Sequence, residues 1–290
     1  MFDSGSRETS ASNAPGYADV TCSAENTGIT LARVRFTELV GLLGFTLPVD
    51  ASLAQVVFPV RRIKAGETLC HAGDPFNAVY VVRSGFFKTV ATETNGAELV
   101  LGFPMPGEVI GLDGVDSGRY LAEVIALDIC NVAVIPFAQL TQLAHQYPCV
   151  EKLLYSLFSR ELVHKNAMAW VLGTLSAEAR LASFLLDLSH RYGRLGYSRT
   201  SFALRATREE IGSYLGLKLE TVSRTLSAFA AAGLIDVNRR QITLRDPAAL
   251  RRVVDPNMED EVATPHQRKS APVATRRPRT LTEAALAMAA

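Results

Sequence analysis

The sequence predicts an α+β fold in three successive parts: an antiparallel β domain of the jelly-roll type, a long helix, and a winged helix-turn-helix. Three observations predict it. Short β-rich runs separated by glycine turns come first, apolar residues then recur with a period of about 3.6, and two short helical patterns joined by a glycine precede a hairpin pattern. We expect a disordered arm over 1–28, the β domain over 29–136, the long helix over 137–173, the winged helix-turn-helix over 174–246 and a disordered tail over 247–290.

The β domain is indicated by strand-like runs between Pro48 and Pro136. VVFPVRRI, AVYVVRSG and ELVLGFPMPG are examples, and turn residues follow each run at intervals of about ten residues. Asn95–Gly96, with apolar runs on both sides, is a strong hairpin signal. This regular spacing of short strands favours an antiparallel sandwich or jelly roll.

The long helix is indicated by apolar residues that recur at alternating spacings of four and three, as in a coiled coil. Such a helix can bury its apolar surface against its own β domain, against a partner helix, or against both. Glu161 and His164 are polar members of this series and either set the register of a dimer or mark where the series leaves the interface. The predicted dimer-interface residues are Val150, Leu154, Leu157, Glu161, His164 and Met168.

A helix-turn-helix is predicted over residues 207–235. Thr207 and Glu210 form a capping-box pattern that begins one helix, and Gly216 supplies the turn that ends it. A second helix then runs to Ala232, and the Ile235–Leu244 segment reads as a hairpin, which makes the motif winged. Three apolar residues of the second helix are expected to face inward: Val222, Leu226 and Phe229.

The polar face of that second helix carries side chains suited to double-stranded DNA. Arginine can bond bidentately to guanine, glutamate can accept from a cytosine amine, and serine can reach a base edge or a phosphate. The predicted base-reading residues are Glu220, Ser223 and Arg224. Residues placed to contact phosphates are Arg208, Lys218, Thr221, Arg239 and Arg240.

The net charge of +1 conceals a partition that agrees with this motif. Residues 1–179 carry 12 Lys and Arg against 18 Asp and Glu, a net charge of −6, whereas residues 180–252 carry 13 against 6, a net charge of +7. A compact basic segment joined to an acidic one is typical of an anion-binding module fused to a sensor or scaffold.

Composition excludes several other classes of protein. A hydrophobic content of 48% supports a sizeable core, and no apolar run is long enough to span a membrane. With no signal-peptide pattern, we expect a cytoplasmic protein without membrane partners. The cysteines and histidines show no metal-ligand spacing, and no nucleophile–base pair or phosphate-cradling loop points to an enzyme.

Together with the motifs described above, several strings of the sequence resemble the CRP/FNR family of transcription regulators, over about residues 35–246. KAGETLCHAGD, VYVVRSG and MPGEVIGLDG are similar to the family's cyclic-nucleotide-binding-type β-roll, and EEIGSYLGLKLETVSR to the DNA-binding motif of its FNR branch. The resemblance implies that Glu220, Ser223 and Arg224 read a TTGAT-type half-site. It also implies a homodimer on an inverted repeat, contact with RNA polymerase, and control of genes in response to oxygen, redox or metabolic state.

The sequence departs from the family at both of its effector sites. The FNR branch holds an iron–sulfur cluster with an N-terminal cysteine cluster and one cysteine of the β-roll, but here Cys22 stands alone and Ala133 takes the β-roll position, with Cys130 three residues earlier. We therefore expect no iron–sulfur cluster.

The cyclic-nucleotide branch needs a Glu and an Arg-Ser pair, where this chain has Leu112 and Tyr120–Leu121. Arg119 is one residue out of register, so we expect no cyclic AMP and no other cofactor. Two alternatives remain open: a thiol-based redox sensor using Cys22, Cys70, Cys130 or Cys149, and a regulator that binds an unidentified small molecule in the β-roll.

Overall fold

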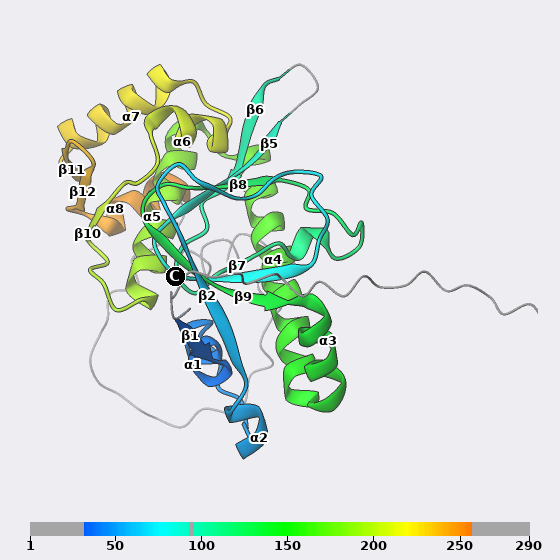
Figure 1. Cartoon of the computed structure of the whole chain (residues 1–290). Coiled ribbons are helices and arrows are strands. Elements are labelled where there is room, and N and C mark those ends of the chain that lie inside the picture. The colour runs from blue at the N-terminus through cyan, green and yellow to red at the C-terminus, as the bar shows by residue number, and fades with distance from the viewer. Residues whose placement is uncertain (1–31, 93–95, 257–290) are drawn as a thin grey trace, which may run out of the picture. The chain divides into compact units, whose positions relative to one another are not determined.

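The computed structural model describes residues 32–92 and 96–256, and Figure 1 shows their helices and strands in chain order. The predicted arm over 1–28 and the tail beyond residue 256 lie outside the described residues. Within the described ranges, no helix is both long and apolar enough to cross a membrane.

The β domain is built from two antiparallel sheets, as the sequence predicts. One sheet has the strand order β1-β2-β9-β4-β7 and the other β3-β8-β5-β6. Strands β5 and β6 pair with each other, which confirms the hairpin expected around Gly96. The strands are β1 (Arg33–Arg35), β2 (Val57–Ile63), β3 (Thr68–Cys70), β4 (Ala78–Ser84), β5 (Phe87–Thr92), β6 (Glu98–Gly102), β7 (Val109–Ile110), β8 (Glu123–Ala126) and β9 (Cys130–Pro136).

Strand β4 shows how the domain is layered, because both of its faces are buried. Tyr80 and Val82 point into the core between the two sheets, and Val79 and Val81 point to the other side. That second side packs against α1 (Phe36–Leu42), α2 (Ala51–Ala54), and the first turns of the long helix. An uninterrupted apolar run in this strand is therefore the expected pattern for a doubly covered strand.

The single helix expected over 137–173 is two helices, α3 (Phe137–Gln146) and α4 (Pro148–Thr174). Tyr147 between them is extended, and Pro148 opens α4. The pyrrolidine ring disfavours helical geometry at the preceding residue but suits the first helical position, so the chain breaks and restarts there.

The C-terminal module follows α4 after a two-residue connection, Leu175 and Ser176. Its sheet is three-stranded, because β10 adds to the β11–β12 hairpin that the sequence predicts. The elements are α5 (Ala177–Arg194), β10 (Ser201–Ala203), α6 (Arg208–Leu215), α7 (Leu219–Ala231), β11 (Ile235–Asn238), β12 (Gln241–Leu244) and α8 (Pro247–Val254).

Helix α8 corrects the domain boundary, because a disordered tail was expected from residue 247. Asp246 caps the helix by accepting a hydrogen bond from the Ala249 amide, at 2.8 Å. Leu250 is completely buried in the core of the C-terminal module. The abundance of Ala, Pro and Arg hid this short amphipathic helix, whose stability comes from packing rather than from local propensity.

Candidate nucleic-acid interface

Helix α6 begins with the predicted capping box. The Thr207 hydroxyl accepts from the Glu210 amide at 3.1 Å, and the Glu210 carboxylate accepts from the Thr207 amide at 2.7 Å. Two amides that would otherwise lack partners are thereby satisfied. The first helix of the motif therefore has a start fixed by its own sequence.

The turn between α6 and α7 depends on two glycines. Gly216 lies in the left-handed region, with φ of 63°, which ends α6 at the predicted residue. A Cβ on Gly212 would stand 2.7 Å from the Leu217 carbonyl oxygen, so any larger side chain at this position would clash with the backbone of the turn. This close approach lets the chain double back, so only three residues, 216–218, separate α6 from α7.

Helix α7 presents the face that the sequence predicts. Val222, Leu226 and Phe229 are buried in the module's core, which confirms their inward orientation. Glu220 and Arg224 are exposed, and Ser223 is half-buried. Within the described part of the chain, the side chains of Glu220 and Arg224 form no hydrogen bond or ion pair, so this face is open to a partner.

The predicted phosphate-contacting residues surround this face on three elements that Figure 1 shows side by side. Arg208 opens α6, Lys218 is the N-cap of α7, and Thr221 lies in its first turn. Lys218 makes no side-chain capping bond, as expected from its lack of an acceptor. Arg239 lies at the tip of the β11–β12 hairpin with φ of 56°, a strained conformation for a non-glycine residue.

Comparisons with known proteins agree with this arrangement. A Crp-like helix-turn-helix domain model matches residues 179–253, and a cyclic nucleotide-binding domain model matches residues 60–147. The transcriptional regulatory protein btr of Bordetella pertussis is 42% identical over 193 residues, which are 67% of this chain and 80% of btr. The chain belongs to the CRP/FNR family of transcription regulators.

Other members of the CRP/FNR family are also similar. The transcriptional activator protein anr of Pseudomonas aeruginosa is 38% identical over 208 residues, or 72% of this chain and 85% of anr. The solved structure of FixK2 from Bradyrhizobium japonicum matches with a TM-score of 0.63 and 28% identity, over 68% of this chain and 98% of that one.

The β-roll of this CRP/FNR regulator does not fit a cyclic nucleotide. Tyr120, which stands where the family's phosphate-binding pair is expected, is buried between the sheets. Its hydroxyl donates to the Ala78 carbonyl oxygen at 2.8 Å and lies 3.3 Å from the Tyr80 hydroxyl. A neutral ring therefore fills space where a phosphate would require a cation. Arg119 faces outward and donates to the Gly73 carbonyl oxygen instead.

The cysteines do not fit an iron–sulfur cluster. Cys70 and Cys130 lie in the core between the sheets, and Cys149 is half-buried at the start of α4. Among the described residues, no three His, Cys, Asp or Glu side chains form a metal-binding group. Burial, helped by Asp113 at Cys70 and by Asp128 at Cys130, raises the pKa of both thiols to about 12. Both therefore stay protonated and weakly nucleophilic, and Cys22 lies outside the described residues.

Of the six predicted dimer-interface residues, Val150 is buried within the chain and the other five are half-buried. Val150 is fully buried against the β domain, and Leu154 and Leu157 pack against the same core. His164 and Met168 face α5 and α6, and Glu161 pairs with Lys165 of its own helix at 3.4 Å. The alternating series therefore packs partly within the chain, and its part in a dimer interface stays a prediction.

A different face of α4 is apolar and exposed. Tyr155 and Leu162 are 62% and 63% exposed, and Leu172 is also exposed. Phe158 is half-buried and Ala169 is exposed on the same side. These five residues follow heptad spacing, at intervals of three, four, seven and three. We call them the α4 stripe: Tyr155, Phe158, Leu162, Ala169 and Leu172.

Sequence reasoning missed Arg180, a residue that joins α4 to the helix-turn-helix. Its guanidinium donates to the carbonyl oxygens of Leu172 and Leu175 at the end of α4, and to that of Leu215 at the end of α6. One side chain thereby satisfies carbonyls at the ends of two helices. No local pattern could reveal it, because Leu215 lies 35 residues away along the chain.

Proposed function

We propose that this CRP/FNR regulator binds an inverted repeat of TTGAT-type half-sites as a homodimer, in the cytoplasm. The observation that carries the proposal is the open face of α7, where Glu220 and Arg224 are exposed without side-chain partners in the described chain and Ser223 is half-buried between them. Arg208, Lys218, Thr221 and Arg239 would contact the phosphates on either side. The protein would act by binding alone, without catalysis.

The second copy would dock on the α4 stripe. A two-fold axis along α4 would bring Leu162 against its counterpart and remove five apolar side chains from water on each chain. Lys165 occupies the heptad position between Leu162 and Ala169, and it is already paired with Glu161, so the seam would not bury an unpaired ammonium group. A parallel pair of α4 helices would then carry the two α7 helices to successive major grooves.

We infer the signal and the effect on transcription from the names of similar proteins. Similar proteins include an anaerobic regulatory protein of Pasteurella multocida and transcriptional activators of Pseudomonas species. We therefore propose that the protein activates transcription through contact with RNA polymerase and that oxygen, redox or metabolic state controls it. The buried Cys70 and Cys130 thiols argue against direct thiol sensing at those two positions.

The test is a fluorescence anisotropy titration of the purified full chain on two labelled duplexes. One duplex carries two inverted TTGAT half-sites with centres one helical turn apart, and the other carries a scrambled sequence of the same composition. At physiological salt we expect binding to the first duplex to be at least about 1,000-fold tighter. Equal affinity for both duplexes would overturn the proposal.

A further inference from the structure

The β domain and the helix-turn-helix module share one apolar core. Val100, Phe103 and Met105 belong to the β domain, yet they are buried in the same cluster as the inward residues of α5, α6 and α7. The Phe103 ring packs edge-on against Phe184 of α5 and Tyr214 of α6, with centroids 6.0 and 5.3 Å away. The C-terminal module is therefore packed against the β domain and is not held by its connection to α4 alone.

Arg191 of α5 is the polar centre of this docking contact. Its guanidinium donates to the Glu108 carboxylate at 2.9 and 2.8 Å, to the Phe103 carbonyl oxygen, and to Asp187 at 3.2 Å. Glu108 is itself held by the Met105 amide at 3.2 Å. Burial alone would lower the pKa of Arg191, but Glu108 and Asp187 outweigh it and raise the pKa, so the Arg191 guanidinium remains charged. A bidentate pair of this kind fixes direction as well as distance.

A second polar contact joins the β domain to α6. Lys88 of β5 donates to the Glu210 carboxylate at 2.9 Å, and both side chains are only 18% exposed. Glu210 is also the carboxylate of the α6 capping box, so Lys88 holds the first turn of the helix-turn-helix. The Ser213 hydroxyl accepts from the Val100 amide at 3.0 Å on the next turn.

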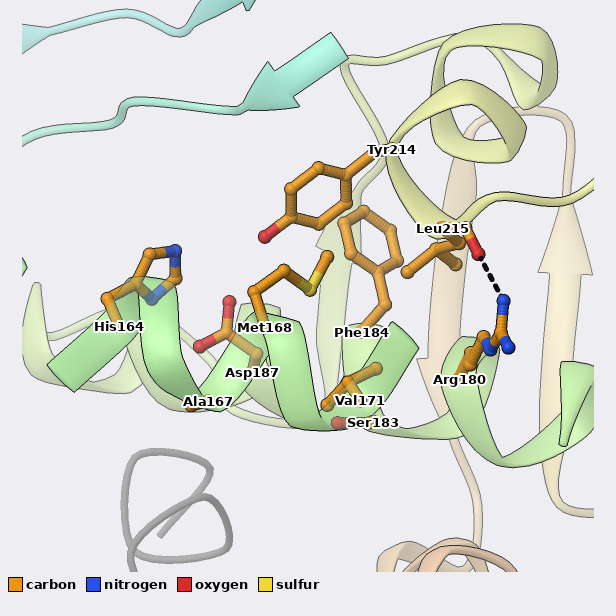
Figure 2. Close-up of a pocket in the computed structure, with 10 residues that line it drawn as sticks. All are labelled: His164, Ala167, Met168, Val171, Arg180, Ser183, Phe184, Asp187, Tyr214 and Leu215. Atoms are coloured by element: carbon orange, nitrogen blue, oxygen red, sulfur yellow. Dashed lines mark hydrogen bonds between the residues drawn. The ribbon is translucent and has the colours of Figure 1, made fainter. Parts of the chain in front are cut away.

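The module also borders a cavity on the side that faces α4. A cavity of about 50 Å³ lies among α4, α5 and α6. In Figure 2, Tyr214 and Asp187 point into it from the module, and His164 and Met168 from α4. Within the described residues, the Tyr214 hydroxyl forms no hydrogen bond. On this side Arg180 ties α5 and α6 to the end of α4, so the tilt of the module about Leu175 and Ser176 is set by that side chain together with the contacts to the β domain.

We propose that the Arg191–Glu108 and Lys88–Glu210 pairs are positioning contacts that set the distance and angle between the two α7 helices of the dimer. In this role they determine which spacing of half-sites the protein accepts, without touching DNA. The inference rests on the proposed function, since half-site spacing has meaning only for a dimer on an inverted repeat.

The geometry of DNA makes this role measurable. Inserting one base pair moves a half-site by about 3.4 Å and rotates it by roughly 35° around the duplex axis. A module that is held by two ionic contacts cannot follow such a change without breaking them. A module without these two contacts keeps the shared apolar core and the Arg180 bonds to α4, but it resists such a change less.

The experiment compares the wild type with Glu108→Gln, Lys88→Met and the double variant on duplexes whose half-site spacing varies from two base pairs shorter to two longer. A duplex with one half-site measures the intrinsic affinity of a single C-terminal module for DNA. Glu67→Gln is the matched control, because Glu67 pairs with Arg61 within the β domain at 3.2 Å. Glu108→Gln keeps the shape of the side chain, and circular dichroism checks that each variant is folded.

We expect a sharp spacing optimum in the wild type and in Glu67→Gln. In the double variant, affinity for the best spacing should fall about tenfold, within the usual range of coupling between sites, while the shifted spacings and the single half-site change less than about threefold. A uniform loss at every spacing, or an unchanged optimum in the folded double variant, would overturn the inference. Wild-type protein that does not distinguish the operator from scrambled DNA would overturn the proposed function, and this inference with it.

Discussion

Helices α4 and α7 each keep one face buried in their own chain and one face exposed, but the exposed faces differ in kind. The α4 stripe is apolar, with Tyr155 and Leu162 more than 60% exposed. The exposed face of α7 is polar and carries Glu220 and Arg224 without ion-pair partners in the described chain. Burying apolar surface is favourable against another apolar surface, whereas unpaired donors and acceptors select a polar partner.

Under the proposed function, the comparison assigns assembly to α4 and recognition to α7, two different helices of one chain. In the proposed dimer, a second copy would cover the α4 stripe without using Glu220, Ser223 or Arg224. Changes on α4 should therefore alter the oligomeric state first, and changes on α7 should alter DNA recognition at constant oligomeric state. The following predictions test that separation, from the largest expected effect to the smallest.

Leu162→Glu should abolish the dimer at micromolar concentration. Two carboxylates would face each other across the two-fold axis, and an unpaired buried charge costs roughly 3–5 kcal/mol. Sedimentation velocity would measure the change. Leu121→Glu is the matched control, because Leu121 is 60% exposed but lies on the β domain. If both variants remain dimeric, the α4 stripe is not the interface.

Arg224→Ala should leave the dimer intact but weaken specific DNA binding by about 1–3 kcal/mol, because a bidentate contact to guanine is lost. Anisotropy titrations should also show less discrimination at that base pair. Ser227→Ala, one turn further along the exposed side of α7, should keep the wild-type preference. An Arg224→Ala variant that discriminates as well as the wild type would remove this residue from the base-reading set.

Lys218→Ser should change stability and binding in opposite directions. A serine hydroxyl can cap α7 where Lys218 cannot, which should stabilise the fold by about 1 kcal/mol. Loss of a phosphate contact should reduce the slope of log affinity against log salt by about one. Thermal unfolding and salt titration measure the two effects, and Lys64→Ser on the β domain should leave the salt slope unchanged. An unaltered slope in Lys218→Ser would exclude the phosphate contact.

His190, a buried polar residue, should make a smaller contribution, to the pH dependence of stability. Burial, together with Arg199 and Arg251, lowers the pKa of His190 below its ordinary value of 6.5. The unfolded chain then takes up this proton at a higher pH than the folded chain, so stability should fall as the pH drops from about 7 through the lowered pKa. Urea unfolding at several pH values should show a shallower fall in His190→Gln, while the exposed His145→Gln should follow the wild type. Equal pH dependence in all three proteins would contradict this.

The helix-turn-helix was predictable because its signals are local. The capping box of Thr207 and Glu210 and the left-handed Gly216 act within four residues of the helix ends that they define. The same holds for the β5–β6 hairpin and the β11–β12 hairpin, which form between neighbours in sequence. In these places, propensity and tertiary structure agree.

The α4 stripe and the domain boundary at α8 could not be predicted from such signals. The periodicity of α4 is the same whether its apolar residues meet the β domain or another chain, and Val150 shows that the first alternative holds at its start. Leu250 likewise looks unremarkable until the core that it enters is known. Arg191 and Arg180 act on partners 83 and 35 residues away, distances at which sequence spacing carries no information.

The shared core described above also limits how such a regulator can change over evolutionary time. Because Phe103 and Met105 complete the core around α5 and α6, the C-terminal module is not an interchangeable part. A chimaera that takes this module from a relative would have to bring a compatible 98–108 segment with it, together with the carboxylate that receives Arg191. The β domain and the C-terminal module are therefore expected to diverge together, with paired substitutions at the residues that contact each other.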